Sequence, residues 1–323
     1  MTSKRSSLTR LGLGLAALGR PAYMTLEHQK DLPRSRTVAN MRAHALAVLD
    51  EAWRLGIRHF DAARSYGRSE EFLAAWLSTH RIRRTAITIA SKWGYRYVGG
   101  WKVRAQVHEV KDHSFAALRE QWAETQGHLG SWVSLYQIHS ATFATGVLKN
   151  REVLDALARI RDDGVRIGLT VTGADQPKLI RAALRIRRGG ARLFDAVQAT
   201  WNLFEPSAGD ALALAHAQGV QVIVKEPLAN GKLTLRGNRR ELAPLLEVAQ
   251  AHRTTPDAIA LAAVLAQPWS DTVLLGAATV EQLRSNVRAT GVRLSQAETT
   301  ALLESLRREP LTYWQERQAI AWR

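Results

Sequence analysis

Four side chains that can hold or move a proton lie at or just after the ends of short apolar runs. Asp61, Lys92 and His139 each end such a run, and Tyr66 follows Asp61 by five positions. A free tyrosine has a pKa of about 10, which is too high for efficient acid–base catalysis near neutral pH. A neighbouring ammonium group favours the tyrosinate and lowers that pKa. These residue types therefore suit a reaction that protonates a carbonyl oxygen while hydride attacks the carbon.

In this chemistry each of the four residues has its own role. Tyr66 is the general acid, Lys92 tunes it, Asp61 keeps Lys92 charged and oriented, and His139 donates a hydrogen bond to the substrate oxygen. Structural alternatives stay open for each: an ion pair between Asp61 and Lys92, a packed loop aromatic at Tyr66, and a histidine without catalytic duty at 139. The coincidence of all four with predicted strand ends favours the chemical interpretation.

The elements that must position these residues form a repeating pattern of short β-branched runs followed by amphipathic stretches. Such alternation is typical of parallel strands joined by helices. It predicts an α/β fold, a (β/α)₈ TIM barrel made as a single domain over residues 1–323, with 309–323 as a C-terminal tail. The eight predicted strands are 9–15, 57–61, 86–92, 133–139, 166–171, 194–199, 220–226 and 272–276.

Helical periodicity and capping residues predict the connecting helices. An additional helix is predicted over 256–266, before the last strand, and a final one over 296–308. The connecting helices are predicted near 41–55, 69–80, 114–128, 151–163, 175–188, 208–218, 239–252 and 280–290.

The glycines after the first run favour a barrel over an open dinucleotide-binding sheet. Gly12 and Gly14 are followed by Gly19 and not by a glycine three residues after Gly14, so the phosphate-binding fingerprint is absent. In a (β/α)₈ barrel the active site forms at the C-terminal ends of the strands. The polar residues at those ends are therefore the candidates for the site.

Composition limits the partners and the location. The formal net charge is +16, but the arginines are scattered and form no dense basic tail, so no nucleic-acid partner is predicted. No run approaches the roughly 20 apolar residues of a membrane span, and the apolar stretch 11–18 is interpreted as part of the first strand instead of a signal peptide. The absence of cysteine is compatible with a reducing compartment, so a cytoplasmic location is expected. The sequence does not indicate an oligomeric state.

Two histidines resemble the pair in a zinc protease motif, but their spacing differs from that of the motif. His108 and His113 are five positions apart, which on a helix would turn them away from a shared face. No metal site is therefore predicted.

Five motifs resemble those of the aldo-keto reductase family, and they occur in the family's order over about residues 9 to 290. The motifs are GIRHFDAARSYGRSE at 56–70, SKWG at 91–94, LYQIH at 135–139, VQATWNLFE at 197–205, and GAAT at 276–279 with Gln282 and Asn286.

This resemblance implies an NAD(P)H-dependent oxidoreductase that moves hydride between nicotinamide and an aldehyde, ketone or sugar-like alcohol. It implies Tyr66 as general acid, Lys92 and Asp61 as its support, and His139 as the group that orients the substrate. The coenzyme is expected to be NADP(H), with NAD(H) as the alternative. The residues expected to contact the coenzyme are Gln198 and Thr170 at the nicotinamide, and Gly276, Ala277, Gln282 and Asn286 at the adenosine half.

Three positions depart from the family pattern, and two of them concern the nicotinamide. Ala62 replaces the usual threonine, and Val171 stands where many members have an asparagine that binds the carboxamide. Lys225 stands where many members have an aromatic residue that stacks on the ring, and Trp201 could replace that stacking. Trp93 and Trp201 are predicted to line the substrate pocket, with the segment 93–113 and the C-terminal tail shaping specificity.

Two other function classes remain open on the sequence. The departures at Val171 and Lys225 leave room for a catalytically weak nicotinamide-binding sensor or regulatory subunit. A lysine at a barrel strand end also suits a Schiff-base lyase that uses Lys225, although the tyrosine, lysine and histidine set has no obvious role in that chemistry.

Overall fold

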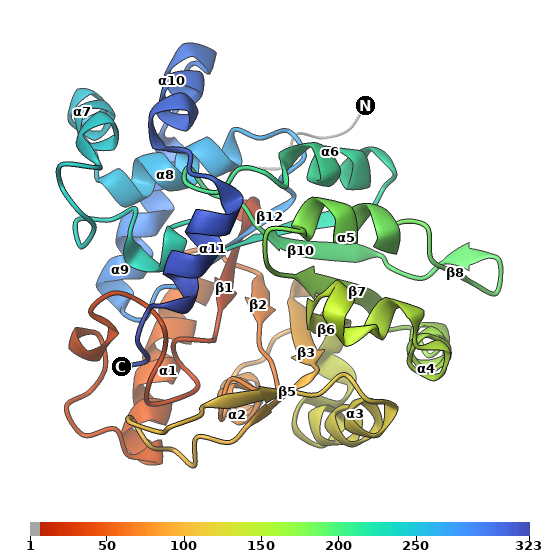
Figure 1. Ribbon diagram of the computed structural model, residues 1–323. Helices are drawn as coiled ribbons and strands as arrows, with labels where there is room; N and C mark the ends of the chain where they lie inside the picture. The colour runs from red at the N-terminus through yellow and green to blue at the C-terminus, as the bar shows by residue number, and fades with distance from the viewer. Residues whose placement is uncertain (1–6) are drawn as a thin grey trace.

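All eight predicted strands are present, and they pair in parallel into a closed barrel (Figure 1). The computed structural model describes residues 7–323. Each strand pairs with its neighbours in the order β1-β12-β11-β10-β7-β6-β3-β2. The barrel strands are β1 (Leu11–Gly14), β2 (His59–Asp61), β3 (Thr88–Trp93), β6 (Val133–Ala141), β7 (Arg166–Val171), β10 (Ala196–Thr200), β11 (Gln221–Lys225) and β12 (Thr272–Leu275).

Helices surround the barrel, and two short antiparallel ribbons project from it (Figure 1). The ribbons are β4 (Tyr95–Tyr97) with β5 (Glu109–Lys111), and β8 (Arg187–Arg188) with β9 (Ala191–Arg192). The helices are α1 (Val38–Arg54), α2 (Ser69–Thr79), α3 (Phe115–Leu129), α4 (Arg151–Asp162), α5 (Gln176–Ala183), α6 (Gly209–Ala217), α7 (Ala243–Ala251), α8 (Pro256–Leu265), α9 (Val280–Val287), α10 (Gln296–Leu306) and α11 (Pro310–Gln318).

The structure corrects the predicted elements in two places. The helix predicted over 175–188 ends at Ala183, because Gly189 and Gly190 adopt positive φ and turn the chain into the β8–β9 ribbon. The segment 309–323, predicted as a tail, contains α11, which buries Tyr313 and Trp314 against α7, α8 and α10.

The barrel interior follows the two-residue period of its strands. Five apolar side chains from β3, β6, β10, β11 and β12 form one buried cluster: Ala90, Leu135, Ala196, Ile223 and Leu274. Side chains two positions further along a strand point to the same side. The next interior layer, nearer the C-terminal ends, therefore includes Lys92, Gln137, Gln198 and Lys225, all polar.

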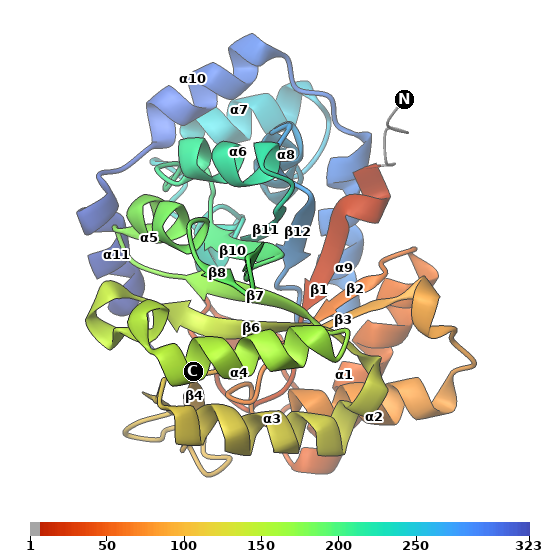
Figure 2. The same ribbon diagram turned by 90° about the vertical axis from the view of Figure 1, so that its right-hand side faces the viewer.

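Two large apolar clusters stabilise this arrangement from outside. One lies between the barrel and the surrounding helices, and the second joins α7, α8, α10 and α11. Figure 2 shows α11, β4 and the C-terminus at the same end of the barrel. The C-terminal segment therefore lies over the end where the polar interior layer opens.

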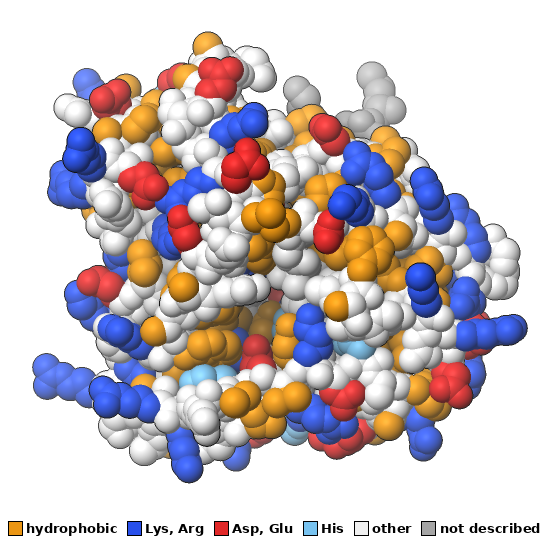
Figure 3. All heavy atoms as spheres, in the orientation of Figure 1, with side chains coloured by type: hydrophobic (Ala, Val, Ile, Leu, Met, Phe, Trp, Pro, Cys, Tyr) orange, Lys and Arg blue, Asp and Glu red, His pale blue; other side chains and the backbone are white. Residues whose placement is uncertain are grey.

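Positive charge is scattered over the face of the molecule that Figure 3 shows. Lys and Arg side chains are spread over the face in Figure 3, with acidic side chains between them. No helix in the described residues combines the length and apolarity that crossing a bilayer requires.

Gly19 joins the loops that follow β1 and β2. A Cβ at this position would lie 2.1 Å from the Tyr66 carbonyl oxygen and 2.6 Å from the Ser69 Cβ. The Gly19 carbonyl also accepts a hydrogen bond from Arg68 N at 2.7 Å. The loop that carries Tyr66 is thus held against a position that only glycine fits.

We expect Gly19→Ala to lower the free energy of unfolding by at least about 2 kcal/mol, because the methyl group overlaps backbone atoms that cannot rotate away. Guanidinium denaturation measures this change. Gly127→Ala, at an exposed α3 position with open space around its Cβ, is the matched control, and it should stabilise by up to about 1 kcal/mol. An alanine at 19 that is tolerated as well as the one at 127 would contradict the prediction.

Candidate active site

A cavity of about 510 Å³ opens at the C-terminal ends of the barrel strands. Figure 3 shows it as a hollow in the middle of the face, with apolar, acidic and histidine side chains gathered there. Asp61, Tyr66 and His139 line one part of the cavity, and Gly276 and Asn286 line another. Its size is within the range of small-molecule and coenzyme sites.

The four residues predicted to transfer a proton lie together. Lys92 is fully buried, and its ammonium donates hydrogen bonds to Asp61 Oδ1 and, at 3.0 Å, to the Ala62 carbonyl. Lys92 Nζ lies 4.6 Å from the ring centre of Tyr66. Tyr66 Oη lies 3.5 Å from His139 Nε2, and the two rings meet edge to face. The phenol therefore lies between an ammonium group and an imidazole.

Two glutamines complete the surroundings of Asp61. Gln198 Nε2 donates to Asp61 Oδ2 at 3.0 Å, and Gln137 Nε2 donates to the same oxygen at 3.2 Å. With Lys92 on the other oxygen, Asp61 has a donor on each side. The carboxylate is thus fixed in place and holds the Lys92 ammonium under the Tyr66 ring.

The electrostatics favour a protonated phenol, which corrects the sequence-based expectation for Tyr66. Burial raises the pKa of Tyr66 well above its ordinary value, the charge of Asp61 adds to this, and Arg20 acts in the opposite direction. Burial also lowers the pKa of Lys92, and Asp61 opposes that shift. Tyr66 therefore holds its proton at neutral pH in this structure, as a donor to a carbonyl oxygen must.

His139 is held neutral. Its pKa lies well below the ordinary histidine value, first because of burial and then because of the charges of Lys92 and Lys225. Ser65 Oγ lies 3.3 Å from His139 Nδ1. A hydroxyl that donates to Nδ1 leaves the ring proton on Nε2, which faces Tyr66. A neutral imidazole in this tautomer can donate a hydrogen bond to an oxygen beside the phenol.

Arg20 is a site residue that the sequence analysis missed. Its buried guanidinium lies 5.1 Å from the ring centre of Tyr66 and 4.5 Å from that of Trp322. It donates to the Ser65 carbonyl at 3.0 Å and to Glu109 Oε1 at 2.6 Å. The signal was available, because Arg20 lies in the loop after the first strand, and such loops reach the active-site face of a barrel.

The residues predicted to bind the adenosine half lie together on another wall of the cavity. Gly276 and Ala277 follow β12, and Gln282 and Asn286 are on α9; all four line the cavity. Gln282 Oε1 accepts a hydrogen bond from Ala278 N at 2.8 Å, which fixes the loop in front of the helix. The Thr279 side chain caps α9. Hydrogen bonds within the chain thus hold this loop against the start of α9.

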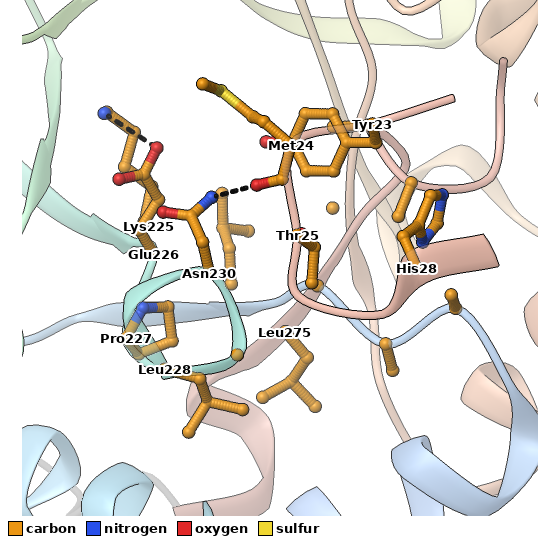
Figure 4. A pocket seen from close by; sticks show the side chains of 18 of the residues that line it. Tyr23, Met24, Thr25, His28, Lys225, Glu226, Pro227, Leu228, Asn230 and Leu275 are labelled. Carbon is orange, nitrogen blue, oxygen red and sulfur yellow. Dashed lines mark hydrogen bonds and ion pairs between the residues drawn. The ribbon is translucent and has the colours of Figure 1, made fainter. Parts of the chain in front are cut away.

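Two buried polar atoms that line the cavity have no hydrogen-bond partner among the described residues. They are Asn230 Oδ1 and His28 Nε2. Figure 4 shows Asn230 and Met24 on facing segments, joined by the hydrogen bond of Asn230 Nδ2 to the Met24 carbonyl. A buried polar atom without a partner is costly. These atoms fit a cavity whose polar ligand completes their hydrogen bonds, as a nicotinamide coenzyme would.

Three predicted site residues lie outside the cavity lining. Thr170 is one layer too deep, since its hydroxyl accepts the Ser140 amide at 2.6 Å while Thr172 lines the cavity. Trp93 follows the inward-pointing Lys92, so it points outward into the apolar cluster between barrel and helices. Trp201 packs against Trp269 in that cluster, so it neither lines the pocket nor supplies the missing ring.

Comparison with known proteins agrees with this geometry. The model of the Aldo/keto reductase family matches residues 10–307. The chain belongs to this family. Its eight-stranded barrel is thus that of an aldo-keto reductase, and the related oxidoreductases support an oxidoreductase function.

Relatives of this chain are named for different activities. An uncharacterized oxidoreductase, YqkF, of Bacillus subtilis is 26% identical over 80% of this chain and 86% of its own. L-galactose dehydrogenase of Arabidopsis thaliana is 27% identical, over 76% of this chain and 77% of its own. NADH-specific methylglyoxal reductase of Escherichia coli is 25% identical, over 92% and 94%.

A solved structure shares the fold. The holo form of aldo-keto reductase AKR11C1 from Bacillus halodurans superposes with a TM-score of 0.70, covering 93% of this chain and 92% of its own at 23% identity. This likeness supports the barrel architecture.

We expect Asp61→Asn to lower the free energy of unfolding by about 3–5 kcal/mol, because it leaves the Lys92 ammonium buried without a counter-charge. The double variant Asp61→Asn/Lys92→Met should lose less than the sum of the single variants, because it removes both charges. Chemical denaturation of the four proteins measures the coupling. Glu27→Gln, which breaks the exposed pair with Lys30, should change stability by less than about 1 kcal/mol. Additive losses would show that the buried pair is not coupled.

We also expect the protein to lose stability as pH falls from 7 to 5. Burial lowers the pKa values of His28, His59 and His113 from 6.5 to about 4. The unfolded chain therefore binds protons first as pH falls below 6.5, and each residue costs up to about 2 kcal/mol at pH 5. Carboxylates whose pKa is lowered in the folded protein reduce its free energy of unfolding only when the pH falls to about 4, the ordinary carboxylate value, or below.

Guanidinium denaturation at pH 7, 6 and 5 measures this loss. The exposed His128→Asn variant is the control and should show the same pH dependence as the original protein. Equal or greater stability at pH 5 would contradict the expected direction.

Proposed function

We propose that this protein is an NADP(H)-dependent oxidoreductase that reduces aldehydes or ketones, or oxidises a sugar-like alcohol in the reverse direction. The single observation that carries the proposal is the position of the Tyr66 phenol, 3.5 Å from His139 Nε2 and above the Lys92–Asp61 pair. Relatives named as a galactose dehydrogenase and a methylglyoxal reductase support this class of substrate.

The residues of this chain supply the proton and hold the substrate oxygen. The coenzyme supplies hydride to the carbonyl carbon when it is bound. Tyr66 then gives its proton to the carbonyl oxygen, and the adjacent Lys92 ammonium stabilises the tyrosinate that remains. His139 Nε2 donates a hydrogen bond to the same oxygen and orients the carbonyl. Asp61 keeps Lys92 charged and in place.

The coenzyme fits the cavity through residues that already line it. Gln198 lines the part beside Asp61. Its amide nitrogen donates to Asp61 and Gln137, and its amide oxygen is left to accept a hydrogen bond from the nicotinamide carboxamide. Gly276, Ala277, Gln282 and Asn286 hold the adenosine half beside the start of α9, where backbone amides suit phosphate. An arginine near the adenosine ribose can bind the 2′-phosphate that distinguishes NADP(H) from NAD(H). Arg284 of α9 is instead paired with Glu51. The NADP(H) preference therefore rests on the habit of the family, and NAD(H) remains the alternative.

The proposed partner is a small carbonyl or alcohol molecule, and not nucleic acid or a membrane. A cytoplasmic location is proposed from the cysteine-free composition.

We expect Tyr66→Phe to lower kcat for aldehyde reduction by about 10²- to 10⁴-fold, because the phenyl ring has no proton to give. The variant should still bind the coenzyme, which fluorescence titration with NADPH and with NADH measures. Tyr97→Phe, on β4 and outside the cavity lining, is the matched control and should keep normal turnover.

Unchanged turnover in Tyr66→Phe would reject this residue as the acid. Tight NADPH binding by the unmodified protein without turnover of any aldehyde would instead favour a sensor or regulatory role.

A further inference from the structure

Each carboxylate around the proton-transferring end of the cavity has a basic partner. Asp61 pairs with Lys92, Glu109 with Arg20, and Glu226 with Arg317 of α11. These three pairs are therefore neutral as units. One further cation, Lys225, lines the same cavity.

Lys225 forms an ion pair with Glu226, but it shares that carboxylate with Arg317. Its ammonium donates to Thr200 Oγ1 at 2.9 Å, and the nearest carboxylate oxygen, Glu226 Oε1, is 3.8 Å away, beyond hydrogen-bond reach. Glu226 is already engaged by Arg317, whose Nε lies 2.8 Å from Oε2 and 3.0 Å from Oε1. The group of Lys225, Glu226 and Arg317 therefore carries one surplus positive charge.

Water screens this surplus charge only in part, because the three side chains are mostly buried. The exposed fractions of the three side chains are 15%, 10% and 17%. A partly buried ion without a counter-ion is destabilising, and a ligand that supplies the opposite charge removes the penalty. Figure 4 shows Lys225 and Glu226 at the edge of the cavity, on the strand end that leads to Pro227.

The charge is also directed toward the reacting groups. Ile223 belongs to the inner apolar layer of the barrel, so Lys225, two positions later, points to the same interior side. Lys225 is among the charges that lower the pKa of His139. The Trp314 ring centre lies 5.7 Å from Lys225 Nζ and bounds the ammonium on the α11 side.

We propose that Lys225 binds a carboxylate carried by the carbonyl substrate, so that aldehydes or ketones with a carboxylate group are the preferred substrate class. This inference rests on the proposed function. One surplus charge matches a monoanion, and the backbone amides at the start of α9 serve the coenzyme phosphates elsewhere in the cavity. In the reaction the carboxylate is unchanged: hydride from the coenzyme forms the C–H bond, and the proton from Tyr66 forms the O–H bond.

The test compares two aldehydes of equal shape, 4-carboxybenzaldehyde and its neutral amide, 4-carbamoylbenzaldehyde. We expect the original protein with NADPH to favour the carboxylate in kcat/KM. The ratio of the two kcat/KM values should fall about 10- to 100-fold in Lys225→Met, the scale of a lost charged hydrogen bond. Lys225→Arg should retain part of the preference. Lys178→Met, at an exposed lysine outside the cavity, should retain all of it.

A ratio that is the same in Lys225→Met and the original protein would overturn the inference. So would a loss of NADPH affinity in Lys225→Met as large as the loss of carboxylate preference, because the ammonium would then serve the coenzyme phosphates. A thermal unfolding midpoint within a few degrees of the original shows that the variant is folded.

A binding measurement separates this inference from the proposed function. If neither aldehyde is turned over, the proposed function fails, and calorimetry with 4-carboxybenzyl alcohol on the NADP-loaded protein decides the inference alone. Binding at least 10-fold weaker in Lys225→Met, with the neutral 4-carbamoylbenzyl alcohol as reference, supports it. Equal binding of the carboxylate by both proteins overturns it.

Discussion

The buried ion pair between Lys92 and Asp61 is the interaction on which the site depends. Neither charge is stable alone inside a barrel, so each requires the other and the hydrogen bonds of Gln137 and Gln198 around them. The pair fixes the ammonium under the Tyr66 ring. The parallel pairing of β2 with β3 provides the distance, because Asp61 lies opposite Ala90, whose side of the strand also carries Lys92. The position of the ammonium under the phenol is thus a consequence of strand register.

The same layer explains why the polar residues are found where they are. Below it, five small or branched apolar side chains fill the barrel and exclude water. Above it, three side chains lie over the opening: Arg20 from the loop after β1, Arg317 from α11, and Trp322 from the residues that follow α11. The charges between these two boundaries lie in a poorly screened environment, which strengthens each electrostatic effect.

Much of the fold was predictable because the spacing of apolar residues that marks a strand or a helix depends on one segment of the chain alone. The eight strand runs and most helix boundaries followed from apolar spacing and caps, and Asp61, Tyr66, Lys92 and His139 were found because strand ends in a barrel converge. Whether Trp93, Trp201 and Thr170 line the cavity depends on two things: which side of the barrel wall each side chain faces, and how deep in the barrel it lies. One position of the chain reverses the side, and two positions change the layer, so proximity in sequence to a site residue was not sufficient.

The sequence alone determined the barrel, the residue types at its mouth and the membership that their motifs indicated. Tertiary structure decided the charge balance among them. Glu226 is engaged by Arg317, from a helix about ninety residues later, so Lys225 has to share this carboxylate, which cannot be derived from strand ends. The direction of the Tyr66 pKa shift was likewise set by burial and then by the charge of Asp61, which together outweigh the opposing charge of Arg20. The physical reason is that desolvation and ion pairing depend on distances between segments that local sequence patterns do not fix.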